Sequence, residues 1–264
     1  MLRVATAQVL RRSSVLLLLA VTCLNAPVLH AATADEAIAA GDAAYAKAQL
    51  VEAIAQYQTA MKAEPTRLAP WLRLVRAESE QSEMLRTDEQ RAMVLRAVEH
   101  ARGAVKLAPD SAATHVWLAV ALGRQALHEG AKTKLALSRE IKAETDRAIA
   151  LDATIGRAWH VLAMWNIKLA SLNMIERMAA NAVLGGVPKG ASFENAEKAF
   201  QRAIALEPDY VNHRLEYGRL LKDLKRTADA RRELEKAVAL PPTSDALDGR
   251  YQGEARELLA KLPR

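Results

Sequence analysis

The stretch Ala196-Glu-Lys-Ala-Phe200-Gln-Arg-Ala203-Ile-Ala-Leu-Glu-Pro208 decides the fold, because its pattern returns along the chain with the same internal spacing. An apolar residue follows the first alanine after four positions, a second alanine follows after three more, and a proline follows after another five. Positions three or four apart share one face of an α-helix, and proline lacks the N–H that would continue one. Further copies span residues 53–65, 97–109 and 230–242, and a degenerate copy spans 141–153.

A second helical pattern precedes each copy, as in Trp71…Leu74-Val75 and Trp159…Leu162-Ala163. Together the two patterns resemble the tetratricopeptide repeat, in which two antiparallel helices form a hairpin that stacks on its neighbours. Alanine at the small positions lets the paired helices approach closely. The resemblance implies an all-α fold, a right-handed solenoid of tetratricopeptide-type hairpins, and no segment has the alternating pattern of a strand.

The repeat spacing predicts five units, of which the middle ones are longer than the standard 34 residues. The extra residues are expected between the two helices of units two to four, with Gly130 and Gly185-Gly186 as C-caps and Ser192 as an N-cap. After the last unit, apolar residues at helical spacing with polar residues opposite predict a capping helix. The predicted units span about 35–65, 68–109, 112–153, 156–208 and 211–242, and the capping helix spans about 246–262.

Residues 1–34 are predicted to be a secretory signal peptide. They carry Arg3, Arg11 and Arg12 and no acidic residue. An apolar run follows over residues 15–24, and the segment ends in the small residues Ala32-Thr-Ala34, as at a signal cleavage site. This layout predicts a periplasmic or secreted mature protein, and a mitochondrial presequence is the alternative. The apolar run is shorter than the ~20 residues that a spanning helix needs, so no stable membrane span is expected.

Composition argues against several classes of function. Cys23 is the only cysteine and lies in the predicted signal, so disulfides and thiol-ligated metals are excluded from the mature chain. The formal net charge is +6, and three of these charges belong to the signal. The charge that remains on the mature chain is too small to indicate nucleic-acid binding. The histidines are dispersed and no nucleophile motif occurs. The sequence therefore predicts no catalytic residue, no metal site and no cofactor, hence a protein that is not an enzyme.

Residues 111–259 carry a more specific pattern. Its parts are His115-Val-Trp117, Gly130 with Lys132 and Lys134, Ile141–Leu151, Trp159–Trp165, Leu172 with Glu176-Arg177, and Pro188–Glu194. This pattern resembles the regulator of microtubule dynamics proteins. The resemblance implies a helical repeat domain without enzymatic activity, which in eukaryotic relatives is associated with microtubules or with organelle membranes and their lipids.

In tetratricopeptide solenoids the first helix of each unit lines the concave surface, and the register then predicts which residues face this groove. An apolar floor with basic residues along it suits an acidic peptide or a phospholipid. Ordinary helix packing and solvated arginines are the competing interpretation. The predicted groove residues are Leu72, Arg76, Val116, Val120, Arg157, His160, Met164, Arg219 and Lys222.

The leading hypothesis is an exported, non-catalytic scaffold that holds a segment of a partner protein in this groove. An alternative is the binding of a phospholipid or another amphiphile in an apolar channel between the lengthened hairpins. A second alternative is a mitochondrial or microtubule-associated protein, as in the eukaryotic relatives.

Overall fold

The computed structural model describes residues 33–183, 186–241, 243 and 245–263, and its contacts divide the chain into two units, residues 1–31 and 32–264. The predicted signal peptide up to residue 32, Gly185 and Pro242 therefore lie outside the described residues. Within the described ranges the second unit contains only helices, which confirms the predicted all-α solenoid of tetratricopeptide type. The helices are α1 (Ala34–Tyr45), α2 (Leu50–Ala63), α3 (Leu68–Ser82), α4 (Thr87–Leu107), α5 (Ala112–Ala126), α6 (Ala131–Leu151), α7 (Gly156–Ala170), α8 (Met174–Val183), α9 (Phe193–Leu206), α10 (Val211–Asp223), α11 (Thr227–Ala239) and α12 (Asp248–Lys261).

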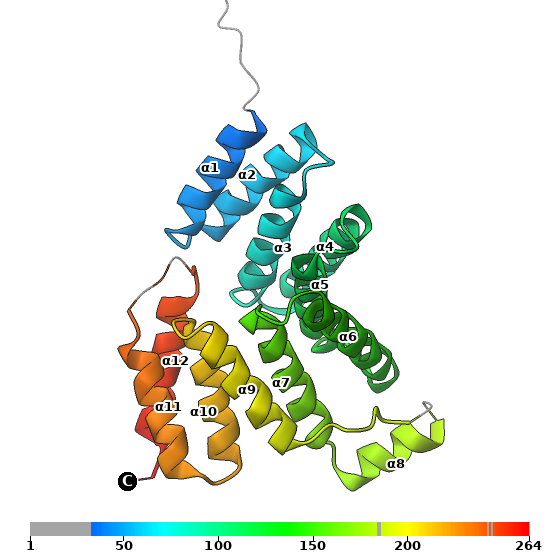
Figure 1. Cartoon of the computed structure of the whole chain (residues 1–264), viewed down its shortest axis with the longest axis vertical. Helices are drawn as coiled ribbons and strands as arrows, with labels where there is room; N and C mark the ends of the chain where they lie inside the picture. Colours follow the sequence, from blue (N-terminus) through cyan, green and yellow to red (C-terminus); the bar gives the residue numbers. More distant parts are fainter. Residues whose placement is uncertain (1–32, 184–185, 242, 244, 264) are drawn as a thin grey trace, which may run out of the picture. The chain divides into compact units, whose positions relative to one another are not determined.

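The helices pair in chain order, α1 with α2, α3 with α4, α5 with α6, α7 with α9 and α10 with α11. Figure 1 shows these pairs following one another along an arc within the second unit, with α12, the predicted capping helix, packed on α10 and α11. The helix α8 is an insertion between the two members of the fourth pair. We call the surface of the first helices of the second to fifth pairs, α3, α5, α7 and α10, the inner face.

Small residues produce the close contact within each pair. A Cβ atom added to Gly41 would lie 2.5 Å from the ring of Tyr57, and one added to Gly218 would lie 2.7 Å from Leu234. Neither position leaves room for a Cβ atom, so the spacing of these two hairpins depends on glycine. The alanines at the second small position of the repeat are at most 1% exposed: Ala60, Ala104, Ala148, Ala203 and Ala237.

The additional residues of the middle units are helical. Helices α4 and α6 have 21 residues each, against 14 in α2, so two of the units are lengthened through their second helix. In the fourth unit the additional residues form α8. Gly130 is the N-cap of α6 and not the predicted C-cap, because α5 already ends at Ala126. Ser192 caps α9 as predicted, since its hydroxyl accepts a hydrogen bond from the N–H of Asn195.

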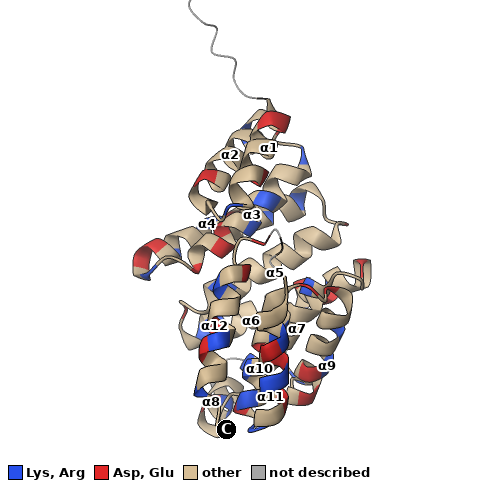
Figure 2. Cartoon of the chain, turned by 90° about the vertical axis from the view of Figure 1, so that its left-hand side faces the viewer, with Lys and Arg blue, Asp and Glu red and all other residues tan. Residues whose placement is uncertain are grey.

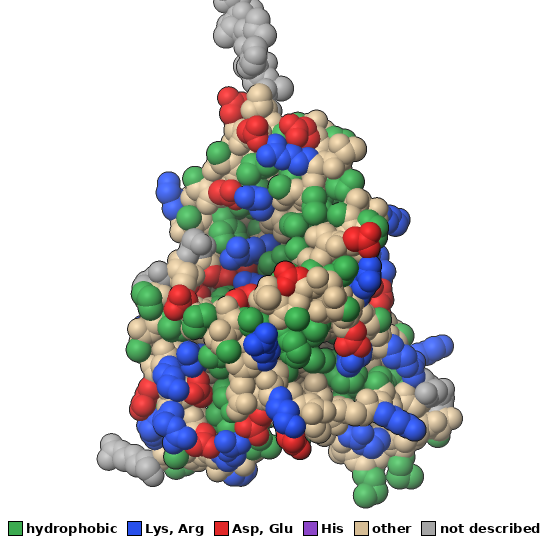
Figure 3. All heavy atoms as spheres, viewed as in Figure 1, with side chains coloured by type: hydrophobic (Ala, Val, Ile, Leu, Met, Phe, Trp, Pro, Cys, Tyr) green, Lys and Arg blue, Asp and Glu red, His purple; other side chains and the backbone are tan. Residues whose placement is uncertain are grey.

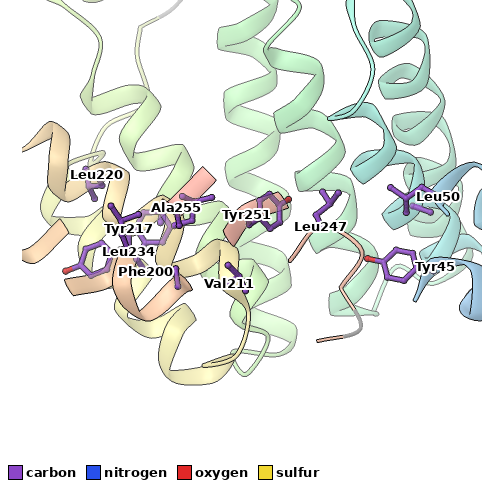
Figure 4. Packing of buried hydrophobic residues seen from close by; sticks show 14 of the residues in the cluster. Tyr45, Leu50, Phe200, Val211, Tyr217, Leu220, Leu234, Leu247, Tyr251 and Ala255 are labelled. Atoms are coloured by element: carbon purple, nitrogen blue, oxygen red, sulfur yellow. The ribbon is translucent and has the colours of Figure 1, made fainter. Parts of the chain in front are cut away.

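One apolar cluster extends from the first hairpin to the capping helix. Figure 4 shows Leu247 between Tyr251 of α12 and Tyr45 at the end of α1. Leu247 is only 2% exposed. The segment that leads into α12 is therefore part of the core of this unit. Among the described helices, none is both long and apolar enough to cross a membrane.

Candidate functional site on the inner face

Two of the predicted groove residues meet on the inner face. Arg76 on α3 donates from Nη2 to Oδ2 of Asp245 at 2.9 Å, and Nη2 of Arg157, in the first turn of α7, lies 3.6 Å from the same oxygen. The Asp245 side chain is 5% exposed. A single buried carboxylate therefore bridges two guanidinium groups from different repeat units. We call Arg76, Arg157 and Asp245 the arginine-pair site.

Aromatic rings hold Arg157 on both sides. Its guanidinium carbon lies 5.0 Å from the ring centroid of Trp117 and 4.3 Å from that of Tyr210, and its Nη1 donates to the Tyr210 hydroxyl at 3.1 Å. Burial by itself would lower the pKa of Arg157, but Tyr210 and Asp245 raise the pKa above its usual value. Burial raises the pKa of Tyr210 to about 12. The site therefore keeps a full positive charge at Arg157.

Arg76 belongs to a second set of contacts. Its Nε donates to Oε1 of Glu80 at 3.1 Å, and its guanidinium lies 4.4 Å from the ring centroid of Tyr45. The Tyr45 hydroxyl donates to the other oxygen of Glu80 at 2.5 Å. Burial, followed by the nearby charge of Asp245, raises the pKa of Glu80. Charge-assisted hydrogen bonds of this kind are about twice as strong as neutral ones, so the contacts fix Arg76 in place.

The chain's own C-terminal segment supplies Asp245. Thr243 and Asp248 stabilise its turn, since the N–H of Thr243 donates to Oδ2 of Asp248 at 2.9 Å. The N–H of Ala246 approaches the Tyr45 hydroxyl at 3.4 Å. An open cavity of about 220 Å³ remains beside the two arginines, with Glu207, Asp209 and Tyr210 among its lining residues. Figure 3 shows basic and acidic side chains together in a hollow of this surface.

Further ion pairs attach α12 to the inner face. Glu83 at the end of α3 accepts hydrogen bonds from Arg124 of α5 and from the Tyr251 hydroxyl of α12, the latter at 2.9 Å. Arg219 of α10 donates to Glu254 of α12 at 2.5 Å. Figure 2 shows that basic and acidic positions are interspersed over α10, α11 and α12. The C-terminal helix is thus held by charge pairing as well as by its apolar side chains.

His160 belongs to a partly buried chain of three titratable groups. Its Nδ1 lies 3.0 Å from Nδ1 of His213, whose Nε2 lies 3.1 Å from Oε2 of Glu207. Burial lowers the pKa of both histidines, so both are neutral at pH 7, and the ring of His160 packs edge-on against Phe200. Within the described ranges no hydroxyl or thiol is bonded to either histidine. This arrangement connects helices and lacks the nucleophile of a catalytic triad.

The other predicted residues do not converge on the arginine-pair site. Val116 is 2% exposed and packs with Ala148 and Ala158, so its side chain offers no surface to a ligand. Val120 packs against the same cluster, and Met164 packs against the large core cluster. Leu72 is half-buried on α3, Arg219 is paired with Glu216 and Glu254, and Lys222 is exposed beside Asp223.

Sequence reasoning missed the acidic and aromatic members of the site. Asp245 lies 169 positions from Arg76, and the repeat pattern gives no information on residues outside the repeats. Glu80 belongs to the run Glu78-Ser-Glu80, which is buried although residues of these types are mostly exposed. Among the described side chains, no group of three His, Cys, Asp or Glu residues could hold a metal ion.

The comparisons with known proteins agree with the pattern of residues 111–259. The family model described as Regulator of microtubule dynamics protein 1-3 matches residues 31–263. The chain is 29% identical over 188 residues to Regulator of microtubule dynamics protein 3 of Rattus norvegicus, which is 70% of this chain and 40% of the rat protein. It is 28% identical over 245 residues to Regulator of microtubule dynamics protein 1 of Mus musculus, which is 90% of this chain and 78% of the mouse protein. The chain thus spans less than half the length of the rat relative.

A solved structure supports the fold. The crystal structure of a thermophilic TPR protein of Thermus thermophilus covers 84% of this chain and 98% of its own chain, with a TM-score of 0.62 and 17% sequence identity. At this level of identity the likeness concerns the fold alone. It places the chain among helical arrays of tetratricopeptide type.

Proposed function

Because the chain belongs to the family of Regulator of microtubule dynamics proteins 1-3, we propose that it is a non-catalytic scaffold that binds a segment of a partner protein on its inner face. Arg76 and Arg157 are the proposed anchors for a carboxylate of that segment. The observation that carries the proposal is the contact of both arginines with Asp245, which the chain itself supplies on a non-helical segment.

This intramolecular contact supports a carboxylate as the ligand of the inner face. A carboxylate lies between two guanidinium groups, and a leucine two positions later enters the apolar core. An external segment with an acidic residue followed by an apolar one would find the same partners once the chain's own segment moved aside. Leu72, Met164, Arg219 and Lys222 are proposed to contact the rest of such a segment. Val116 and Val120 would support it from the packing behind.

A phospholipid is a poorer fit to this site. The cavity beside the arginines measures about 220 Å³ and is lined by Glu207, Asp209 and Asp245 as well as by the two arginines. This volume lies below the ~300–1,000 Å³ that is usual for small-molecule sites. The geometry therefore favours a peptide over a lipid.

The experiment uses a labelled peptide that copies residues 241–252. We expect the chain with Asp245→Asn to bind this peptide at least tenfold more tightly than the unsubstituted chain, because the tethered segment of the latter competes at ~mM effective concentration. A control peptide with asparagine in place of the aspartate that copies Asp245 should not bind. Equal affinities of the two peptides for the Asp245→Asn chain would show that the arginines do not select a carboxylate.

Microtubules are the second candidate partner, and the names of the relatives favour them. Co-sedimentation of the purified chain with polymerised tubulin tests this candidate directly. We expect the chain in the pellet only when microtubules are present, with a pelleted fraction that falls as salt increases. A chain that stays in the supernatant at all concentrations of polymer would remove microtubules as a partner.

For the location of the protein we propose export followed by removal of the predicted signal segment before Thr33, which caps α1, with mitochondrial import as the alternative. Both proposals follow from the arginines and the apolar run of this segment. N-terminal sequencing of the protein recovered from fractionated cells separates them. A protein that keeps its first residue and stays in the cytosol would contradict both.

A further inference from the structure

We propose that the chain carries a second binding site, away from the inner-face arginines, for an acidic peptide segment that includes a large apolar side chain. The site is a cavity of about 360 Å³ that α7 shares with α6, with α9 and with the loop before α9. We call it the Trp–Lys cavity. Its lining includes Trp159, Leu162, Trp165, Lys142, Lys189 and Lys198.

Two indoles form a fixed apolar floor. The Trp165 N–H donates to the Ser138 carbonyl at 2.8 Å, and the Trp159 N–H donates to the Ala153 carbonyl at 3.0 Å. Trp165 is 6% exposed and Trp159 is half-buried. Since their only polar atoms are already bonded, the rings offer carbon surface to the cavity. A floor that is already rigid lowers the entropic cost of binding an apolar side chain.

Lysines stand around this floor. Nζ of Lys142 lies 2.6 Å from Asp146, and Nζ of Lys198 lies 2.6 Å from Glu194. Each of these partners is four residues away on the same helix and more than half exposed, and neither lines the cavity. Exposed pairs of this type contribute about 0–1 kcal/mol. A ligand carboxylate can therefore replace either acid at little cost.

Lys189 completes the set from the loop. Among the described residues it has no ion-pair partner. The loop that carries it is held in place, because the N–H of Ser192 donates to Oδ1 of Asn166 at 3.1 Å and Nδ2 of Asn195 donates to the Gly190 carbonyl at 2.8 Å. Gly190 has a φ of +86°, which glycine adopts without strain. Three lysines from α6, from the loop and from α9 thus border one cavity.

The charge balance distinguishes this cavity from the arginine-pair site. There, Glu207, Asp209 and Asp245 face the two arginines, whereas none of the described residues that line the Trp–Lys cavity is acidic. Its volume lies within the range of ligand sites, about 300–1,000 Å³. The three lysines lie on separate elements, so each can pair with a different carboxylate along a peptide. A single phosphate would instead require the three lysine side chains to converge on one point. The apolar floor would receive the side chain between those carboxylates.

The probe for this site is the blocked pentapeptide Asp-Glu-Leu-Asp-Glu, titrated into the full chain while tryptophan fluorescence is recorded. The matched probe is Asn-Gln-Leu-Asn-Gln, which has the same shape without charge. We expect a saturable fluorescence change with the acidic probe, weakened by salt, and none with the neutral one. The double substitution Lys189→Glu and Lys198→Glu should weaken binding at least tenfold.

The matched control carries Lys132→Glu and Lys168→Glu, which makes the same change in net charge at exposed lysines outside the cavity. This variant should keep at least half of the original affinity. Equal loss in both variants, or equal binding of the neutral probe, would overturn the proposed site. Inorganic phosphate that alone reproduces the fluorescence change, with the same dependence on Lys189 and Lys198, would overturn the peptide as ligand. Because Trp117 contacts Arg157, a fluorescence change could also arise at the arginine-pair site; the dependence on Lys189 and Lys198 separates the two sites.

Discussion

Replacing Asp245 by asparagine tests whether the C-terminal segment is held by charge. The substitution keeps the volume of the side chain and removes the negative charge that Arg76 and Arg157 share. Removal of one member of a buried ion pair costs about 3–5 kcal/mol when the other charge is left alone. Here Arg76 retains Glu80 and Arg157 retains the Tyr210 hydroxyl. The expected loss is therefore smaller, about 2 kcal/mol, which is typical of a hydrogen bond to a charged group.

The assay is thermal and urea-induced unfolding of the purified chain at pH 7, followed by far-ultraviolet circular dichroism. For a domain of this size, a loss of about 1 kcal/mol in the free energy of unfolding lowers Tm by roughly 2–4 °C. The substitution Asp245→Asn should therefore lower Tm by roughly 4–8 °C. The matched control is Asp209→Asn, an exposed acid that lines the same cavity and has no ion pair within the described ranges. It should change stability by no more than about 0.5 kcal/mol. Equal effects of the two substitutions would refute the bridging role of Asp245.

Two further predictions concern packing and protonation. Because the pKa of His160 is lowered in the folded chain, acid protonates this histidine in the unfolded chain first, and the free energy of unfolding falls as pH decreases below about 6.5. The substitution His160→Phe should reduce the dependence of the free energy of unfolding on pH by up to about 1.4 kcal/mol per pH unit. Urea unfolding between pH 5 and 7 measures this dependence. Gly103→Ala places a Cβ 2.3 Å from the Trp71 ring and should cost about 1–3 kcal/mol, whereas Gly123→Ala meets open space and should stabilise by about 0.5–1 kcal/mol; equal shifts in Tm would contradict this.

The repeat pattern predicted the helices because each one depends on local spacing. Alanine and a large apolar residue three or four positions apart define the buried face of a helix, and the structure buries Ala203 and Phe200 completely. The same pattern could not predict α8, because an insertion carries no repeat signal. It also assigned Val116 to the groove, whereas the packing of α5 against Ala148 and Ala158 turns this side chain inward.

The inner face was harder to predict for a physical reason. Helical periodicity gives the direction of each side chain but does not determine which polar groups meet when distant elements pack together. Arg76 and Arg157 were expected along a groove open to a ligand, yet their common partner comes from the segment before α12. The burial of Glu80 could not be predicted for the same reason, because a polar residue in an amphipathic helix is normally expected to face solvent.

The two cavities differ in what neutralises their positive charge, and this difference bears on which one is available to a ligand. At the arginine-pair site the neutralising carboxylate is supplied by the same chain at ~mM effective concentration, so any competing segment must overcome that advantage. In the Trp–Lys cavity the nearest acids are exposed neighbours on the same helices, and Lys189 has none among the described residues. A ligand there displaces only weak pairs. We therefore expect acidic peptides to fill the Trp–Lys cavity at lower concentrations than the arginine-pair site of the unsubstituted chain.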